Sequence, residues 1–170
     1  MPAHTLARCR LRLDLNLLKT AAETRPVQAA IQGLRVPTPA DDHQLASLMF
    51  HAYLGTTDYE GESEADALAE IQRTLGGRYG PFNWTASRVI ERENNILVSA
   101  ALLTRFGNAP MVAYLMTRPD FKRRGLAHAC LESAVNKLVL DGERAVRLAV
   151  SIANAEAMAL YRQLGFVVEE

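Results

Sequence analysis

The segment from Met111 to Phe166 constrains the fold of this chain more than any other part. The nearly uninterrupted apolar run MVAYLMT leads into the basic glycine turn KRRGLA, and a long amphipathic stretch follows. A second alternating run, VRLAVSI, precedes a short helical pattern that ends at Gly165. A strand that is apolar almost throughout is typical of the centre of a sheet covered on both faces. The order predicts a parallel strand–helix–strand unit within a mixed α/β sheet.

The glycine turn at residues 122–127 also predicts a place for an anion. A strand that runs into such a turn and then a helix directs several unpaired backbone N–H groups at one point. The positive end of the helix dipole lies at the same point, which suits a phosphate or diphosphate. Asn154 opens the last helical pattern, and Tyr161 lies seven residues later on the same face. An anion site and a reactive hydroxyl can therefore face one cleft.

The chain before this unit predicts antiparallel strands and two helices. Alternating or β-rich runs indicate strands, and these runs are Cys9 to Leu15, Leu34 to Val36, Thr85 to Glu91 and Ile96 to Thr104. The turn Asn94-Asn95 joins the last two runs into a β-hairpin. Capping boxes predict helix starts at Thr38 to Asp41 and at Ser63 to Asp66. Residues 19–33 are expected to form a loop with at most one helical turn.

Composition excludes several classes of protein. Nineteen basic residues balance nineteen acidic ones in 170 residues, so no overall charge favours nucleic acid or a membrane as partner. No apolar run reaches the roughly 18 to 20 residues that span a bilayer. Cys9 and Cys130 are the only cysteines, which favours a reducing compartment and hence a cytoplasmic location. The four histidines lack metal-ligand spacing, so no metal site is expected.

Two motifs resemble the GNAT superfamily of acyl-CoA-dependent N-acetyltransferases. Lys122-Arg123-Arg124-Gly125-Leu126-Ala127 resembles its diphosphate motif, which is Arg or Gln, two residues, Gly, one residue, then Gly or Ala. Residues 154–166 resemble its N-x-x-A-x-x-L-Y-x-x-x-G-F block, and residues 55–67 resemble a bacterial subgroup of unassigned acceptor. Either motif alone is a weak signal, but both at this separation, with a strand between them, are a strong one. Lys122 departs from the motif, because lysine lacks the planar fork of arginine.

The resemblance implies a GNAT-like α/β fold, with a mixed, mostly antiparallel central sheet and helices on both faces. Residues 34–170 would form the acetyltransferase domain, and residues 1–33 an N-terminal extension whose strand joins the sheet. Members of the family usually continue into one more strand, whereas this chain ends at Glu170. We expect the strand from Cys9 to Leu18 to cover the sheet where that strand would lie.

The resemblance also implies acetyl-CoA as co-substrate and a primary amine of a small molecule or peptide as acceptor. The coenzyme-binding residues that it implies are Leu115, Met116, Thr117, Lys122, Arg123, Arg124, Gly125, Leu126, Ala127, His128 and Asn154. A backbone N–H of Met116 or Thr117 would polarise the thioester carbonyl. The amine would attack directly, and Tyr161 would be the catalytic residue that protonates the departing thiolate.

The acceptor side leaves more alternatives open. Asp58, Glu60 and Glu62 lie between the first two helices and are candidates for binding or deprotonating the amine, although ordered water could equally remove the proton. Without the family context, Tyr161 reads as a core aromatic and Asn154 as a helix cap. A non-catalytic CoA-binding regulatory module of the same fold is the main alternative. A dinucleotide-binding protein is disfavoured, because the turn lacks the three-glycine spacing. An apolar edge makes a homodimer plausible.

Overall fold

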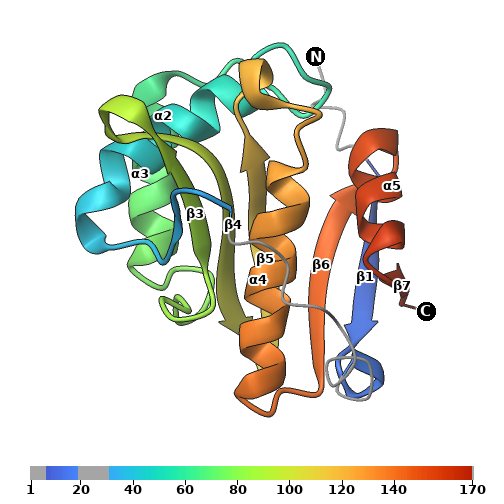
Figure 1. Cartoon of the computed structure of the whole chain (residues 1–170). Helices are drawn as coiled ribbons and strands as arrows, with labels where there is room; N and C mark the ends of the chain where they lie inside the picture. Colours follow the sequence, from blue (N-terminus) through green and yellow to red (C-terminus); the bar gives the residue numbers. More distant parts are fainter. Residues whose placement is uncertain (1–6, 19–30, 170) are drawn as a thin grey trace.

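A seven-stranded sheet runs through the molecule in the order β2-β3-β4-β5-β6-β1-β7 (Figure 1). The computed structural model describes residues 7–18 and 31–169, so most of the loop expected at 19–33 lies outside the described residues. The strands are β1 (Arg8–Asp14), β2 (Leu34–Arg35), β3 (Arg88–Arg92), β4 (Ile96–Phe106), β5 (Ala109–Thr117), β6 (Ala145–Ser151) and β7 (Val167–Val168). Of these seven strands in the described residues, only β5 and β6 pair in parallel. The predicted mixed, mostly antiparallel sheet is confirmed.

Helices lie on both faces of this sheet. They are α2 (Asp42–Tyr53), α3 (Glu64–Leu75), α4 (Leu126–Leu140) and α5 (Ala155–Gln163). The capping box at Thr38 is present, but it opens a 3-10 turn over Pro39–Asp41, and α2 starts only after it. The capping box at Ser63 opens α3 directly, as predicted.

The first strand of the predicted hairpin begins later than expected. Residues from Thr85 were expected to be extended, yet β3 starts at Arg88. Asn83 accounts for the difference, because its side-chain oxygen accepts hydrogen bonds from Ala86 N at 3.0 Å and Thr85 Oγ1 at 3.2 Å. Such local bonds hold the backbone in a turn and compete with strand pairing. The Asn94-Asn95 turn is as predicted, with both residues in the left-handed region.

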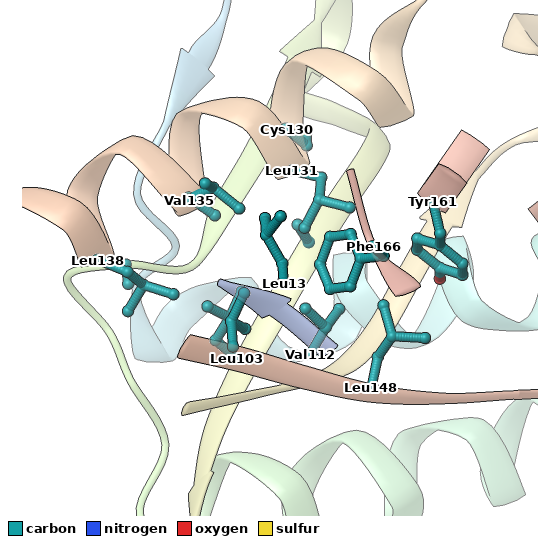
Figure 2. Close-up of a cluster of buried hydrophobic side chains, with 14 of the residues drawn as sticks. Leu13, Leu103, Val112, Cys130, Leu131, Val135, Leu138, Leu148, Tyr161 and Phe166 are labelled. Atoms are coloured by element: carbon teal, nitrogen blue, oxygen red, sulfur yellow. The ribbon is translucent and has the colours of Figure 1, made fainter. Parts of the chain in front are cut away.

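Two hydrophobic clusters hold the layers together. On one face, leucines of α4 pack on Leu13 of β1 and Leu148 of β6 (Figure 2). Met158 of α5 belongs to the same cluster. On the other face, α2 and α3 pack on β3, β4 and β5 through Leu48 and Ile71. The second cluster contains no residue of β6 or β1, so α2 and α3 cover only part of the sheet.

The N-terminal strand belongs to the first cluster. β1 lies between β6 and β7 and is antiparallel to both. Its Leu11 and Leu13 are buried, while Arg10, which precedes Leu11, is exposed.

The strand predicted from its alternating pattern therefore forms and joins the sheet, but it ends at Asp14 and not at Leu18, and residues 16–18 are helical. The expectation that no strand follows Phe166 is wrong, because the short β7 lies outside β1 at the edge of the sheet. The division of the chain at residue 33 stays a prediction.

Leu13→Ala is expected to lower the free energy of unfolding by about 3 kcal/mol, because the side chain is buried in the core and its removal leaves a cavity. Arg10→Ala on the same strand should change it by less than about 0.5 kcal/mol. Urea unfolding followed by the fluorescence of Trp84 measures both values. Equal effects of the two substitutions would contradict the role of β1 in the core.

Candidate active site

The parallel strands β5 and β6 separate soon after they pair. Their register covers only Met111 with Arg147 and Val112 with Leu148. Beyond this point a cleft of about 1420 Å³ opens, lined by both strands, the starts of α4 and α5, and the α2–α3 region. The C-terminal ends of parallel strands are where open α/β sheets hold their ligands.

The glycine turn leaves the start of α4 with unpaired donors. Arg123 and Gly125 adopt left-handed conformations, with φ of 62° and 74°. The first backbone bond into α4 runs from Ala129 N to Gly125 O at 3.0 Å. Within the described residues, the N–H groups of residues 123–128 have no backbone acceptor. Unpaired donors at the positive end of a helix form an anion site.

The basic side chains of the turn point in different directions. Lys122 and Arg123 line the cleft, and the Lys122 ammonium lies 3.9 Å from a Glu156 carboxylate oxygen. Arg124 is not among the lining residues, because it stacks over the Phe121 ring at 4.9 Å and donates to Asp120 O at 3.1 Å. Two of the three predicted cations thus face the cleft, and Arg124 braces the turn.

The ladder between β4 and β5 decides which amides of β5 face the cleft. Arg118 N donates to Val98 O, and the register continues with Met116 opposite Ala100. Because N–H directions alternate along a strand, the Met116 amide also points to β4, and the Thr117 amide points to the open side. Of the two amides expected to meet the thioester, Thr117 is therefore the one directed at the cleft.

Tyr161 is both a core residue and part of the cleft wall. Its ring centroid lies 5.7 Å from that of Phe166, and the residue is 7% exposed (Figure 2). It also lines the cleft. Burial raises the pKa of Tyr161 well above its ordinary value, so the phenol keeps its proton at neutral pH.

Asn154 likewise has both a structural role and a place in the cleft. Its side chain caps α5 by accepting a hydrogen bond from Ala157 N at 3.0 Å, and the residue borders the cleft.

The acidic loop between α2 and α3 contributes unequally to the cleft. Asp58 and Glu62 line it, whereas Glu60 does not. The Glu60 N–H donates to the Glu62 carboxylate at 2.9 Å, so part of the loop's acidity organises the loop itself. Asp58 is only partly exposed and its charge acts on Tyr53, the last residue of α2.

Sequence reasoning missed Glu70 on α3. This residue lines the cleft and accepts hydrogen bonds from Tyr114, Arg73 and Tyr79. Burial alone would raise the pKa of Glu70, but these hydrogen bonds outweigh it and lower the pKa below its usual range. The carboxylate therefore stays ionised. Tyr114 was the available signal, because a tyrosine in an otherwise apolar central strand needs a partner for its hydroxyl.

The described part of the chain offers neither a metal-binding cluster nor a membrane-spanning helix. Residues 7–18 and 31–169 contain no group of three or more His, Cys, Asp or Glu side chains that could hold a metal ion. Within the same residues no helix has the length and apolar character to cross a membrane.

Known proteins share this sequence pattern and this fold. Residues 47–166 match the model of the Acetyltransferase (GNAT) family. The [Ribosomal protein bS18]-alanine N-acetyltransferase of Escherichia coli is 31% identical over 121 residues, which cover 66% of this chain and 77% of that protein. Its solved structure superposes with a TM-score of 0.58 at 20% identity, covering 78% of this chain and 75% of that chain.

Two further structures extend the comparison. A GCN5-related N-acetyltransferase from Sphaerobacter thermophilus superposes with a TM-score of 0.67 at 17% identity, covering 95% of this chain. This chain spans only 48% of that structure. An aminoglycoside N-acetyltransferase in complex with CoA gives a TM-score of 0.61 at 14% identity, covering 86% of this chain and 95% of that chain. With the family match spanning more than half of its residues, the chain belongs to the GNAT family of acetyltransferases.

Proposed function

We propose that this protein transfers the acetyl group of acetyl-CoA to a primary amine by direct attack, without a covalent enzyme intermediate. The observation that carries the proposal is the shared cleft of the unpaired amides at residues 123–128 and the protonated phenol of Tyr161. The amides would donate hydrogen bonds to the diphosphate of CoA, and the phenol would donate a proton to the departing sulfur.

The donor would lie along the opening between β5 and β6. Amides at the start of α4 would hold the diphosphate, with Lys122 and Arg123 adding positive charge. The Thr117 N–H, directed at the cleft, would donate to the thioester carbonyl as negative charge develops on it. Attack forms the C–N bond and breaks the C–S bond, and the proton of Tyr161 passes to the departing thiolate.

The acceptor would enter from the α2–α3 side. An amine with a pKa near 10 is only about one part in a thousand neutral at pH 7, so it arrives mainly as an ammonium ion. The carboxylates of Asp58, Glu62 and Glu70 line this side and suit a positive charge. Glu70 has a lowered pKa and is a poor proton acceptor, so we assign it to holding the ammonium. Water in the cleft would take the proton.

Asp58→Asn is expected to raise KM for a cationic amine about threefold to fivefold, because exposed charge pairs contribute up to about 1 kcal/mol. Glu60→Gln is the matched control, since it removes an equal charge from the same loop without touching the cleft. Steady-state kinetics with one diamine measures both. If Glu60→Gln raises KM as much as Asp58→Asn, the loop acts through its overall charge and the assignment of Asp58 fails.

Purified protein mixed with acetyl-CoA and an amine panel, with release of the CoA thiol followed over time, tests the proposal. The panel should include peptides with N-terminal alanine, the residue named for the Escherichia coli relative. We expect amine-dependent thiol release. Binding of CoA without turnover on any acceptor would instead favour the non-catalytic module.

The free thiols of Cys9 and Cys130 fit a reducing compartment, so our proposal keeps the enzyme in the cytoplasm.

A further inference from the structure

One face of β1 carries arginines, and within residues 7–18 and 31–169 no hydrophobic cluster joins a helix to that face. Leu11 and Leu13 point into the cluster with α4 and α5, so the alternating residues Arg8, Arg10 and Arg12 lie on the opposite face. Arg10 is exposed, and so is Ala149, its partner on β6. The cluster beneath α2 and α3 does not extend to these strands. Among the described residues this face is therefore exposed at Arg8, Arg10 and Ala149.

The start of β1 brings Arg8 to the cleft. Arg8 pairs in register with Ser151, the last residue of β6, and both residues line the cleft. The charge of Arg8 also acts on the end of α2: burial raises the pKa of Tyr53 to about 12, the charge of Asp58 adds to the rise, and the charge of Arg8 opposes it. Arg8 thus lines the same cleft as Asp58 and Glu62.

Ser151 supplies an independent observation. The residue is 4% exposed, and within the described residues its hydroxyl makes no hydrogen bond. No other side-chain oxygen or nitrogen in the described part of the chain is buried without a partner. Leaving such a group unpaired costs about 1–3 kcal/mol, and native proteins keep few of them. A buried hydroxyl without a hydrogen-bond partner, beside a cationic side chain, would gain a partner from an anionic ligand.

The arginines of this region differ in their pairing. Arg12 lies 3.6 Å from the Asp14 carboxylate, and Arg147 donates to Glu169 at 2.7 Å. Among the described residues, Arg8 and Arg10 take part in no ion pair. Positive charge is therefore neutralised near the end of β1 and left uncompensated over its first three residues, of which Arg8 lines the cleft. So small a patch suits one or two carboxylates rather than a polyanion.

We propose that Arg8 and Ser151 form a carboxylate-binding subsite, so that the acceptor is an amine that also carries a carboxylate. This inference rests on the proposed acetyltransferase function. A guanidinium and a hydroxyl can both donate hydrogen bonds to a carboxylate. The charge of the guanidinium favours a carboxylate over a neutral group. The acidic side chains of the α2–α3 wall would hold the ammonium of the same molecule. The carboxylate belongs to a free amino acid or to an acidic residue next to a peptide N-terminus.

Matched acceptor pairs test the subsite. Lysine and cadaverine differ only in the carboxylate, and C-terminally amidated peptides beginning Ala-Asp and Ala-Asn differ only in the side-chain charge. In at least one pair we expect kcat/KM for the member with the carboxylate to be about fivefold higher than for the other member. The difference should lie mostly in KM, and its size is that of a partly exposed ion pair. A preference in the first pair identifies an amino acid, and one in the second pair identifies an acidic peptide.

Variants then locate the preference. Arg8→Gln should bring the ratio of the two kcat/KM values close to one, and Arg8→Glu should reverse it. Arg12→Gln is the matched control, because it removes an arginine from the same face of the same strand, but one already paired with Asp14. It should keep the preference. Ser151→Ala should reduce the preference without lowering affinity for CoA, and thermal melts confirm that each variant folds.

Two outcomes overturn the inference: equal kcat/KM values within both pairs, or a preference that survives Arg8→Gln. Failure of the proposed function looks different, because no member of either pair would then be acetylated at all. CoA affinity is measured by calorimetry on the same samples. It distinguishes a protein that binds CoA but acetylates no acceptor from one whose CoA site is damaged.

Discussion

Replacing Gly125 with valine is expected to weaken CoA binding by at least about 100-fold while the protein still folds. A Cβ at this position would meet no protein atom within 4 Å, so the free protein has room for the side chain. The same room would be occupied by the diphosphate in the complex, where the side chain would shield the amides of residues 123–128. Losing several charge-assisted hydrogen bonds of about 1.5–3 kcal/mol each accounts for an effect of this size.

The backbone conformation provides the control for this experiment. Gly125 has φ of +74°, where a β-branched residue is strained, so valine also costs stability. Gly142 has φ of +81°, lies after the far end of α4, and has equally open surroundings. Gly142→Val should therefore cost similar stability and keep CoA affinity. Calorimetric titration and thermal melts of both variants give the comparison. Equal affinity for CoA in the two variants would remove the turn from the coenzyme site.

Tyr161→Phe is expected to lower kcat about tenfold to 100-fold without abolishing activity. General acids typically contribute more, but the leaving thiol has a reference pKa near 8.5 and departs readily even without a proton. The ring remains, so packing against Phe166 and stability should change little. Steady-state kinetics should show KM for acetyl-CoA nearly unchanged. Phe166→Leu is the control, because it disturbs the same packing without removing the hydroxyl, and turnover should persist.

The pH dependence gives a second readout of Tyr161. Because its pKa is raised above the ordinary value of about 10, the phenol should stay protonated from pH 7 to pH 10. We expect no fall in wild-type kcat over this range from loss of the acid. Unchanged turnover in Tyr161→Phe would assign the tyrosine to the core alone.

Local rules explain why the backbone around the proposed donor site could be predicted from sequence. The start of α4, the turn at Gly125 and the cap at Asn154 each depend on residues within one or two helical turns. Glycine in a left-handed position and asparagine as a helix cap are properties of single residues. The same local reasoning gave the wrong start for β3, because the side-chain bonds of Asn83 compete with the strand preference of Thr85.

The acceptor side depends on register and on contacts between distant segments. Glu70 meets Tyr114 only because α3 packs across β5, and Arg8 meets Ser151 only because β1 pairs with β6. A shift of one residue in the β1–β6 register would turn Arg8 away from the cleft. The direction of the Thr117 amide likewise follows from pairing with β4 and not from the residue type. Such facts come from topology, which the alternating patterns of the single strands do not contain.

A crystal structure of the protein with CoA tests the central claim most directly. We expect diphosphate oxygens within hydrogen-bond distance of backbone N–H groups from residues 123–128, and the sulfur between β5 and β6 near the Tyr161 hydroxyl. A diphosphate bound elsewhere, with those amides still facing solvent, would contradict the assignment of this cleft to the coenzyme.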